Sequence, residues 1–249
     1  MPLVGTFDLS EYGDSKPLVL EPNTEPWELR GAGHLQLMFE IDDTEMLDLL
    51  PAALHPTIPP TMLINVLHVS ESSVGPFTLA EVRIGCRSGG RPRAFLVDGY
   101  CDSAAAISEL RSRWGYPVKE AEVVLEARHY QVMAKVTRRG KVLLDCSLEE
   151  PEAINGADIQ YLPNMNFARM KRDGAELVRL IQVDADYAIT KADRGRPLVR
   201  VFDEEDWGTA GVKPQWPVSA SYTEGTVTLP RVRYVVNPAL RPLEAVETL

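Results

Sequence analysis

The chain has 249 residues, of which 45% are hydrophobic and 25% charged, and its formal net charge at pH 7 is −10. This composition is typical of a soluble globular protein with a buried core. The acidic residues are spread along the sequence, which argues against binding to nucleic-acid phosphates because that binding requires a basic face. A local basic pocket for a small acidic ligand stays possible, because net charge says little about one cavity.

The three cysteines, Cys86, Cys101 and Cys146, are isolated and form no Cys-Xaa-Xaa-Cys pair. We therefore expect neither a zinc site nor a disulfide framework, and a reducing compartment fits better. The first twenty residues lack the basic start and the apolar core of a signal peptide. No run approaches the roughly 18 apolar residues that cross a bilayer. The expectation is a cytoplasmic protein with no membrane partner and no nucleic-acid partner.

In chain order, residues 1–32 are expected to form an irregular N-terminal arm, and 33–249 a single domain. The alternation in 33–41 predicts a strand. The segment 43–51 predicts one short helix, with Asp43 or Thr44 as its cap and Pro51 as its end. The prolines of 51–60 then predict an extended loop.

The remainder of the chain is rich in β-branched and aromatic residues, which favour strands. The expected strands are 61–69, 77–87, 93–101, several within 121–148 around a turn at 138–141, and then 157–163, 177–190, 197–202 and 226–236. The clearest helix is 102–114, which Asp102 or Ser103 can cap and Gly115 ends. Roughly a dozen short strands with two or three helices predict an α+β fold, predominantly β, whose antiparallel sheet is curved or closed as a cone or barrel.

The first candidate site is the end of that helix, in 108-SELRSRWGYPVK-119. Arg111 and Arg113 lie where the negative end of the helix dipole favours cations, which needs no function to explain it. Alternatively, an arginine at a helix end that faces a cavity can hold a carboxylate through two parallel hydrogen bonds.

The second candidate is Glu81. Side chains alternate between the faces of a strand, so Glu81 shares a face with Phe77, Leu79 and Arg83, a mixed face such as a barrel lumen presents. A carboxylate there can have a raised pKa and move a proton. The alternative is an exposed acid that pairs with Arg83 or with a neighbouring strand.

Other polar patterns give weaker indications. The four histidines, His34, His55, His68 and His129, show no metal-binding spacing, and we expect no metal and no cofactor. Asp184 and Asp186 face the same way on a strand but have no third ligand nearby. No Gly-Xaa-Ser-Xaa-Gly motif is present, and 88-SGGR-91 suits a hairpin tip better than a phosphate loop.

Several segments in order resemble the acetoacetate decarboxylase family: LLPAALHPTIPP (49–60), a Gly-Pro-Phe…Glu strand (75–81), the helix and Gly-Tyr-Pro turn (109–117), LPNMNF (162–167) and TLPRVRYVV (228–236). The resemblance runs from about residue 33 to 237. It implies a β-rich cone- or barrel-like fold with an internal pocket, and a homo-oligomer.

The resemblance also implies a chemistry that this chain lacks at the matching positions. In the family a lysine amine, activated by desolvation beside a second cation, forms a Schiff base with a keto acid before CO₂ leaves. The family's lysine pair falls here on Ser112 and Arg113, followed by Trp114 and the Gly-Tyr-Pro turn that contains Tyr116. A guanidinium is effectively always protonated and is no amine nucleophile. Lys119 and Lys135 are the alternatives for a relocated lysine.

The family's other pocket residues carry over unevenly. Its pocket glutamate matches Glu81, a second acid falls near Asn65, and Arg30 lies two positions from the family's pocket arginine. The resemblance thus implies Glu81 and Arg113 as catalytic residues, and Arg30, Asn65, Ser112, Trp114 and Tyr116 as substrate-binding residues.

Three functions follow from this comparison. The first is a lyase-type enzyme that acts on an oxo- or hydroxy-carboxylate by decarboxylation, dehydration, enolisation or cyclisation without a Schiff base. In it Arg113 and Arg30 bind the carboxylate or stabilise a developing enolate, and Glu81 moves a proton. The second is a non-catalytic binding protein for an acidic small molecule. The third is a Schiff-base decarboxylase that uses a relocated lysine.

Overall fold

The structure, a computed structural model, describes residues 3–7, 16–19, 25–42, 46–172, 174–209, 211–242 and 244–248. Most of these residues lie in strands: β1 (Leu18–Val19), β2 (Trp27–Glu40), β3 (His55–Pro56), β4 (Thr61–Glu71), β5 (Phe77–Ser88), β6 (Arg91–Cys101), β7 (Val118–Glu120), β8 (Glu122–Arg128), β9 (Gln131–Arg138), β10 (Lys141–Ala153), β11 (Asn164–Arg172), β12 (Ala175–Val183), β13 (Asp186–Phe202), β14 (Trp216–Leu229), β15 (Tyr234–Val236) and β16 (Val246–Thr248). Within these described residues the helical elements are α1 (Ala104–Trp114) and the 3₁₀ turns Met46–Leu49 and Gly156–Asp158.

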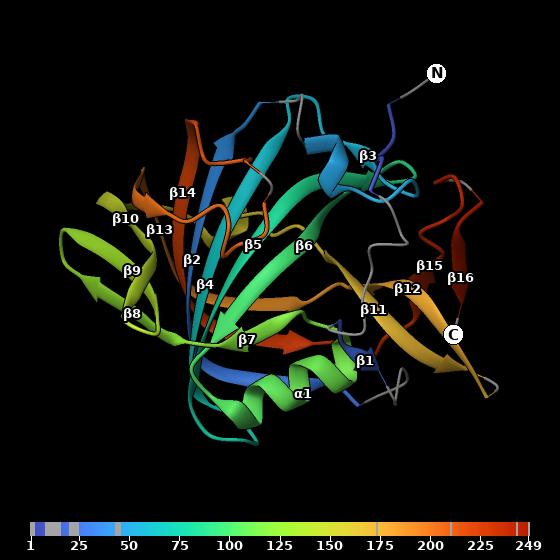
Figure 1. The fold of residues 1–249 in the computed structure, drawn as a ribbon. Helices are drawn as coiled ribbons and strands as arrows, with labels where there is room; N and C mark the ends of the chain where they lie inside the picture. The colour runs from blue at the N-terminus through green and yellow to red at the C-terminus, as the bar shows by residue number, and fades with distance from the viewer. Residues whose placement is uncertain are drawn as a thin grey trace.

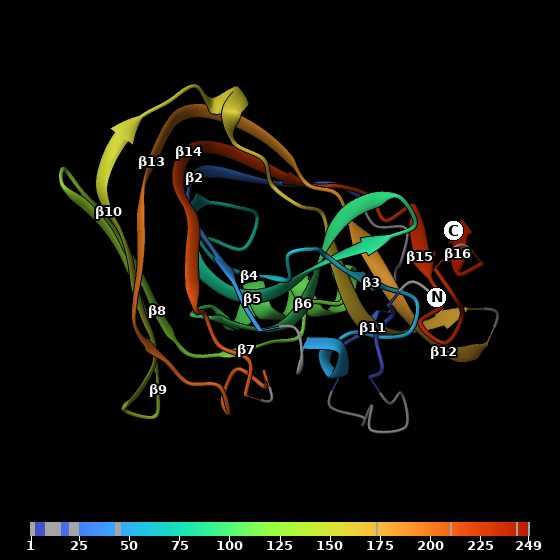
Figure 2. The same cartoon turned by 90° about the horizontal axis from the view of Figure 1, so that it is seen from above.

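The strands form one sheet in the order β16-β15-β12-β11-β6-β5-β4-β2-β14-β13-β10-β9-β8. Neighbours along this path are antiparallel except β11 and β6, which are parallel. The two ends of the path do not pair, so the sheet stays open, but its long strands bend and the sheet curls round its own interior (Figure 2). The helix α1 contacts β1, β6 and β7 on one side of the curl (Figure 1).

Strand β5 is central to this arrangement because both of its faces are buried. Ala80, Val82 and Ile84 point to the larger of two apolar clusters. Phe77 and Leu79, on the opposite face, belong to the smaller cluster, which also contains the buried face of α1. Alternation along one strand therefore separates the core into two compartments. The smaller compartment contains the candidate site.

Much of the predicted fold is confirmed. The structure is mostly β and strongly curved, and the strands expected at 33–41, 61–69, 77–87 and 93–101 fall within β2, β4, β5 and β6. The helix expected at 102–114 is α1, and its cap is Ser103, whose side chain accepts a hydrogen bond from the Ala106 amide. The turn at 138–141 is present, with Arg139 and Gly140 at positive φ.

Other expectations were wrong. The segment 157–163 is the end of a 3₁₀ turn followed by a loop, although its composition favours a strand, and Tyr161, Leu162 and Pro163 of this loop line a cavity. The segment 177–190 belongs to two strands, β12 and β13. The helix expected at 43–51 is only the 3₁₀ turn Met46–Leu49, and its expected caps, Asp43 and Thr44, lie outside the described residues.

The end of α1 depends on one glycine. Gly115 has a φ of 67°, and the Tyr116 amide donates to the Leu110 carbonyl oxygen at 3.1 Å, which closes the helix and turns the chain. A Cβ at Gly115 would lie 2.7 Å from Cβ of Ala168. The sequence Gly-Tyr-Pro is therefore a turn that only glycine can begin here.

We expect Gly115→Ala to lower the free energy of unfolding by about 1–3 kcal/mol, from left-handed backbone strain and the contact with Ala168. Gly140→Ala is the matched control, because Gly140 has a φ of 79° but a Cβ there meets nothing within 4 Å. Urea denaturation of both variants measures the difference. If both variants lose the same free energy of unfolding, the contact with Ala168 contributes nothing to the destabilisation by Gly115→Ala.

Cys86, Cys101 and Cys146 are buried and unpaired, and within the described ranges no three His, Cys, Asp or Glu side chains gather as a metal-binding group. No helix of the described chain is long and apolar enough to cross a membrane.

Candidate active site

A partly enclosed cavity lies in the smaller core compartment, between the concave face of the sheet and the end of α1. Its volume is about 30 Å³. This volume is larger than the roughly 10–15 Å³ that one water molecule needs. The walls are largely apolar: Leu29, Leu67, Phe77, Leu79, Leu110, Val183, Val227 and Leu229. Eight polar residues also line it, namely His34, Glu81, Arg83, Tyr116, Tyr161, Asn164, Asp184 and Tyr187. Apolar walls combined with polar groups that converge on one cavity are typical of a small-molecule site.

The register of the sheet places polar residues side by side on this face. One cross-strand row runs Ser221–Gln36–Asn65–Glu81–Gly99 across β14, β2, β4, β5 and β6. All four side chains in the row are buried. Gly99 ends the row without a side chain, and a Cβ there would lie 2.8 Å from Cγ1 of Val118. The row forms a buried polar strip that leads to Glu81.

The main charged feature of the cavity is an ion pair between Glu81 and Arg83. The two residues are i and i+2 on β5, so they share a face, and Nη2 of Arg83 donates to Oε2 of Glu81. Their side chains are only 3% and 6% exposed. The other carboxylate oxygen of Glu81, Oε1, and Nε of Arg83 are buried and have no hydrogen-bond partner among the described residues. Each charged group therefore has one buried polar atom that no described residue satisfies.

The surroundings of Arg83 keep it charged. Burial acts most strongly and by itself lowers the pKa of the guanidinium, but Glu81, Tyr187 and Tyr116 together raise the pKa above its usual value. Arg83 is thus a permanent cation within an apolar enclosure, where the interaction of a charge with a ligand is stronger than in water.

Tyr116 reaches the cavity from the turn after α1. Its hydroxyl accepts a hydrogen bond from Nδ2 of Asn164 at 3.0 Å. Burial, and then the charge of Glu81, raise the pKa of Tyr116 well above its usual value, so the phenol keeps its proton. Tyr116 is therefore a neutral hydroxyl group beside the ion pair.

Three stacked rings form another wall. The ring of Tyr161 lies 4.1 Å from that of Tyr187 and 4.5 Å from that of His34, measured between centroids. The Tyr161 hydroxyl is fixed by Oγ1 of Thr223 at 2.7 Å. Nε2 of His34 lies 3.2 Å from Oδ1 of Asn65. The stack joins β2, β13 and the loop before β11 in one rigid wall.

Among the residues that the sequence predicted for the site, Glu81 and Tyr116 line the cavity. Asn65 lies beside Glu81 in the cross-strand row and contacts His34, but it does not itself line the cavity. The pairing of Glu81 with Arg83, which the sequence suggested for an exposed acid, does occur, but it is buried.

Arg113 is not in the cavity, and this corrects the expected position of the guanidinium. Its Cζ lies 4.2 Å from the Trp114 ring centroid, and the side chain binds Oε2 of Glu109 and the carbonyl oxygen of Glu25, at 2.9 and 2.5 Å. The helix turn directs it outward because Leu110 and Trp114 occupy the inward face of α1.

The remaining predicted residues also lie elsewhere. Ser112 donates to the Ser108 carbonyl oxygen within the helix, which is an ordinary helix-surface contact. Trp114 is fully buried, but it packs in the core and donates from Nε1 to the Pro230 carbonyl oxygen. Arg30 is 58% exposed and pairs with Glu28 and Glu71 on the surface.

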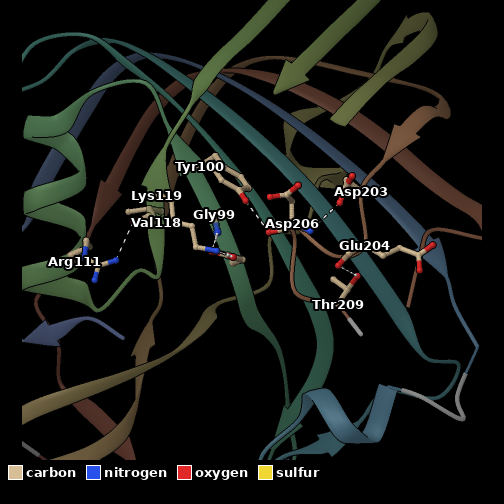
Figure 3. A network of polar contacts seen from close by, with 10 residues as sticks. Gly99, Tyr100, Arg111, Val118, Lys119, Asp203, Glu204, Asp206 and Thr209 are labelled. Atoms are coloured by element: carbon tan, nitrogen blue, oxygen red, sulfur yellow. Dashed lines mark hydrogen bonds and ion pairs between the residues drawn. The ribbon is translucent and has the colours of Figure 1, made fainter. Parts of the chain in front are cut away.

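None of the seven lysines, all of which fall within the described ranges, lines the cavity. Lys119 is 42% exposed and pairs with Asp98. Figure 3 shows it beside Gly99 and Tyr100, and near the contact of Arg111 with the Val118 carbonyl oxygen. Lys135 is exposed on β9. Neither alternative lysine is in a position to form a Schiff base in this cavity.

Sequence reasoning missed Arg83, His34, Tyr161, Asn164 and Tyr187 as cavity residues. For Arg83 the signal was available, because the alternation that placed Glu81 on a mixed face placed Arg83 there too. The others come from separate strands and a loop that only the curl of the sheet brings together.

The sheet thus curls round a cavity that contains a buried ion pair. The family model described as acetoacetate decarboxylase (ADC) matches residues 15–238. The chain belongs to the acetoacetate decarboxylase family. None of the curated protein sequences matches it.

Solved structures share the fold at low sequence identity. A structure described as acetoacetate decarboxylase has 18% identity and a TM-score of 0.75, covering 93% of this chain and 95% of its own. Acetoacetate decarboxylase from Legionella pneumophila subsp. pneumophila str. Philadelphia 1 has 16% identity and a TM-score of 0.73, with 84% and 86% covered. The enduracididine biosynthesis enzyme MppR, complexed with the condensation product of pyruvate and imidazole 4-carboxaldehyde, has 16% identity and a TM-score of 0.66, with 94% and 96% covered.

Proposed function

We propose that this protein is a lyase-type enzyme that acts on a small oxo- or hydroxy-carboxylate without a lysine Schiff base. The observation that carries the proposal is the buried Glu81–Arg83 pair in a cavity that no lysine lines within the described chain. Family membership supports lyase-type chemistry, and the enduracididine enzyme, which shares the fold, was captured with a product derived from an oxo acid, pyruvate.

In this proposal Arg83 takes the role that the sequence assigned to Arg113. Its Nε–H has no hydrogen-bond partner among the described residues, so it is available to donate to a ligand carboxylate or to the oxyanion of a developing enolate. The guanidinium is already held in place by Glu81, so it needs little reorganisation as charge develops on the substrate.

Glu81 is the group that moves a proton. A carboxylate beside the bound substrate takes a proton from the substrate carbon or delivers one to it, in a dehydration, enolisation, cyclisation or decarboxylation. Its free Oε1 is the atom available for that transfer.

Borohydride reduction in the presence of an oxo acid is expected to leave every lysine unmodified by a substrate-derived group. The reason is geometric, because Lys119 and Lys135 lie outside the cavity. Mass spectrometry of the digested protein, with a Schiff-base-forming enzyme treated in parallel, measures this. A reduced adduct on any lysine would establish the relocated-lysine mechanism instead.

The same proposal distinguishes an enzyme from a binding protein. A panel of small oxo and hydroxy acids, tested by the ligand-induced rise in melting temperature, identifies ligands through their preferential binding to the folded state. Each acid that stabilises the protein is then incubated with it and followed by NMR for conversion. Binding without conversion of any stabilising acid would identify a non-catalytic binding protein.

A further inference from the structure

His34 is a buried polar residue of the cavity that the proposed chemistry does not use. It lies on β2, is 3% exposed and lines the cavity next to Tyr161 and Tyr187. Its Nε2 contacts Oδ1 of Asn65, whereas its Nδ1 is buried without a hydrogen-bond partner among the described residues. A buried ring nitrogen without a partner carries a desolvation cost that a ligand can relieve.

The environment fixes both the charge and the tautomer of this ring. Burial, and then the nearby charge of Arg83, lower the pKa of His34 to about 3, against the opposing effect of the Asn65 hydrogen bond. The imidazole is therefore neutral near neutral pH and has a single N–H. With the oxygen of Asn65 facing Nε2, that N–H is on Nε2, and Nδ1 presents a lone pair.

Three buried atoms on cavity residues have no partner among the described residues: Oε1 of Glu81 and Nδ1 of His34, which are acceptors, and Nε of Arg83, which is a donor. The hydroxyl of Tyr116 accepts from Asn164 and is a further donor in the cavity, so a ligand carbonyl can be accommodated there. Nδ1 of His34 accepts from no described group, and a ligand hydroxyl provides the donor that it lacks.

We infer that the ligand of this cavity is a small hydroxy-carboxylate, whose carboxylate faces Arg83 and whose hydroxyl donates to Nδ1 of His34. This inference rests on the proposed function and narrows it, because it selects the hydroxy acids from the wider class of oxo and hydroxy acids. Asn65 is the positioning residue, since its amide oxygen holds the proton on Nε2. The Tyr161 ring keeps the imidazole in place.

The test uses lactate and pyruvate, which have the same carbon skeleton and carboxylate but differ in a hydroxyl against a carbonyl. Dissociation constants are measured by calorimetry for pyruvate and for both lactate enantiomers. The tighter lactate enantiomer is expected to bind roughly tenfold more strongly than pyruvate. Equal or weaker binding of both lactates, or no binding of any of the three, would overturn the inference.

Two variants distinguish the effect of the Nδ1 lone pair of His34 from the effect of the shape of the cavity wall. His34→Phe keeps a ring against Tyr161 but removes the acceptor, so the preference for lactate is expected to disappear. Asn65→Leu leaves both ring tautomers accessible, so the preference should decrease without vanishing. A His34→Phe variant that stays folded by circular dichroism and keeps the full preference for lactate would refute the role of Nδ1.

A spectroscopic measurement reports the tautomer directly. In ¹⁵N-histidine NMR of the wild-type protein, His34 is expected to be a neutral imidazole with its proton on Nε2, and Asn65→Leu is expected to shift it toward a mixture. A resonance that shows the proton on Nδ1 in the wild type would overturn the inference. If His34 had only a structural role, the preference for lactate would not change when Asn65→Leu changes the tautomer.

Failure of this inference is distinguishable from failure of the proposed function. A lactate preference that depends on His34, with no conversion of any acid, would support the ligand class and reject the lyase. Conversion of an oxo acid that Glu81 controls, without any lactate preference, would support the lyase and reject the role of His34.

Discussion

Replacing Glu81 with glutamine is expected to lower turnover by about 10²- to 10⁴-fold, the range that general acid–base groups contribute. Glutamine keeps the shape of the side chain and an oxygen that accepts from Arg83, but it does not exchange a proton at the relevant pH. A carboxylate ligand is expected to bind as well as before or more tightly, because Arg83 no longer has a competing anion. The change thus affects kcat and leaves KM the same or lower.

The measurement is steady-state turnover of an acid found in the ligand screen, with binding measured by calorimetry. Glu152→Gln is the matched control, because Glu152 is 72% exposed and pairs with Arg194 at 3.5 Å on the surface. Its turnover should equal that of the wild type. If Glu81→Gln retains full turnover while folded, Glu81 has no part in the proton transfer.

Arg83→Met is expected to lower the free energy of unfolding by about 3–5 kcal/mol, because it leaves the carboxylate of Glu81 buried without its cation. The double variant Glu81→Gln/Arg83→Met removes both charges and should recover a large part of that loss. The two substitutions are therefore expected to be strongly non-additive, as neighbours in one ion pair are.

Urea denaturation of the wild type, both single variants and the double variant gives the coupling energy directly. The exposed pair Arg194–Glu152 provides the control cycle, with Arg194→Met and Glu152→Gln, and we expect about 0–1 kcal/mol there. A coupling energy at Glu81–Arg83 no larger than that of the exposed pair would show that the buried ion pair does not stabilise the fold.

The sequence was most informative where one local pattern decided the structure. The capping residue and the glycine at either end of α1 predicted its bounds to within two residues, and alternation placed Glu81 on a mixed face of β5. It was least informative at 157–163, whose composition suits a strand but whose partners are residues distant in the chain. No local sequence pattern predicts which strands from opposite ends of the chain will pair, as β2 and β14 do.

The site cation was misplaced for an identifiable physical reason. Family order drew attention to Arg113, the position where a reactive lysine is expected, but side chains on a helix diverge by about 100° from one residue to the next. Leu110 and Trp114 take the inward direction, so Arg113 turns outward. A strand keeps residues i and i+2 on one face, which made Arg83 the better choice. At this position, alternation along β5 was a better guide to the cation of the site than the resemblance to the family.

Strand β5 separates the two core compartments, and this has a consequence for how the protein can change. The ion pair is on the same strand as Val82 and Ile84, whose side chains fill the larger compartment. A shift of one position along this strand would exchange the two faces and bury the charges in hydrocarbon. We therefore expect a one-residue insertion or deletion in β5 to disrupt both compartments at once, whereas a substitution of Glu81 or Arg83 in place leaves the strand register unchanged.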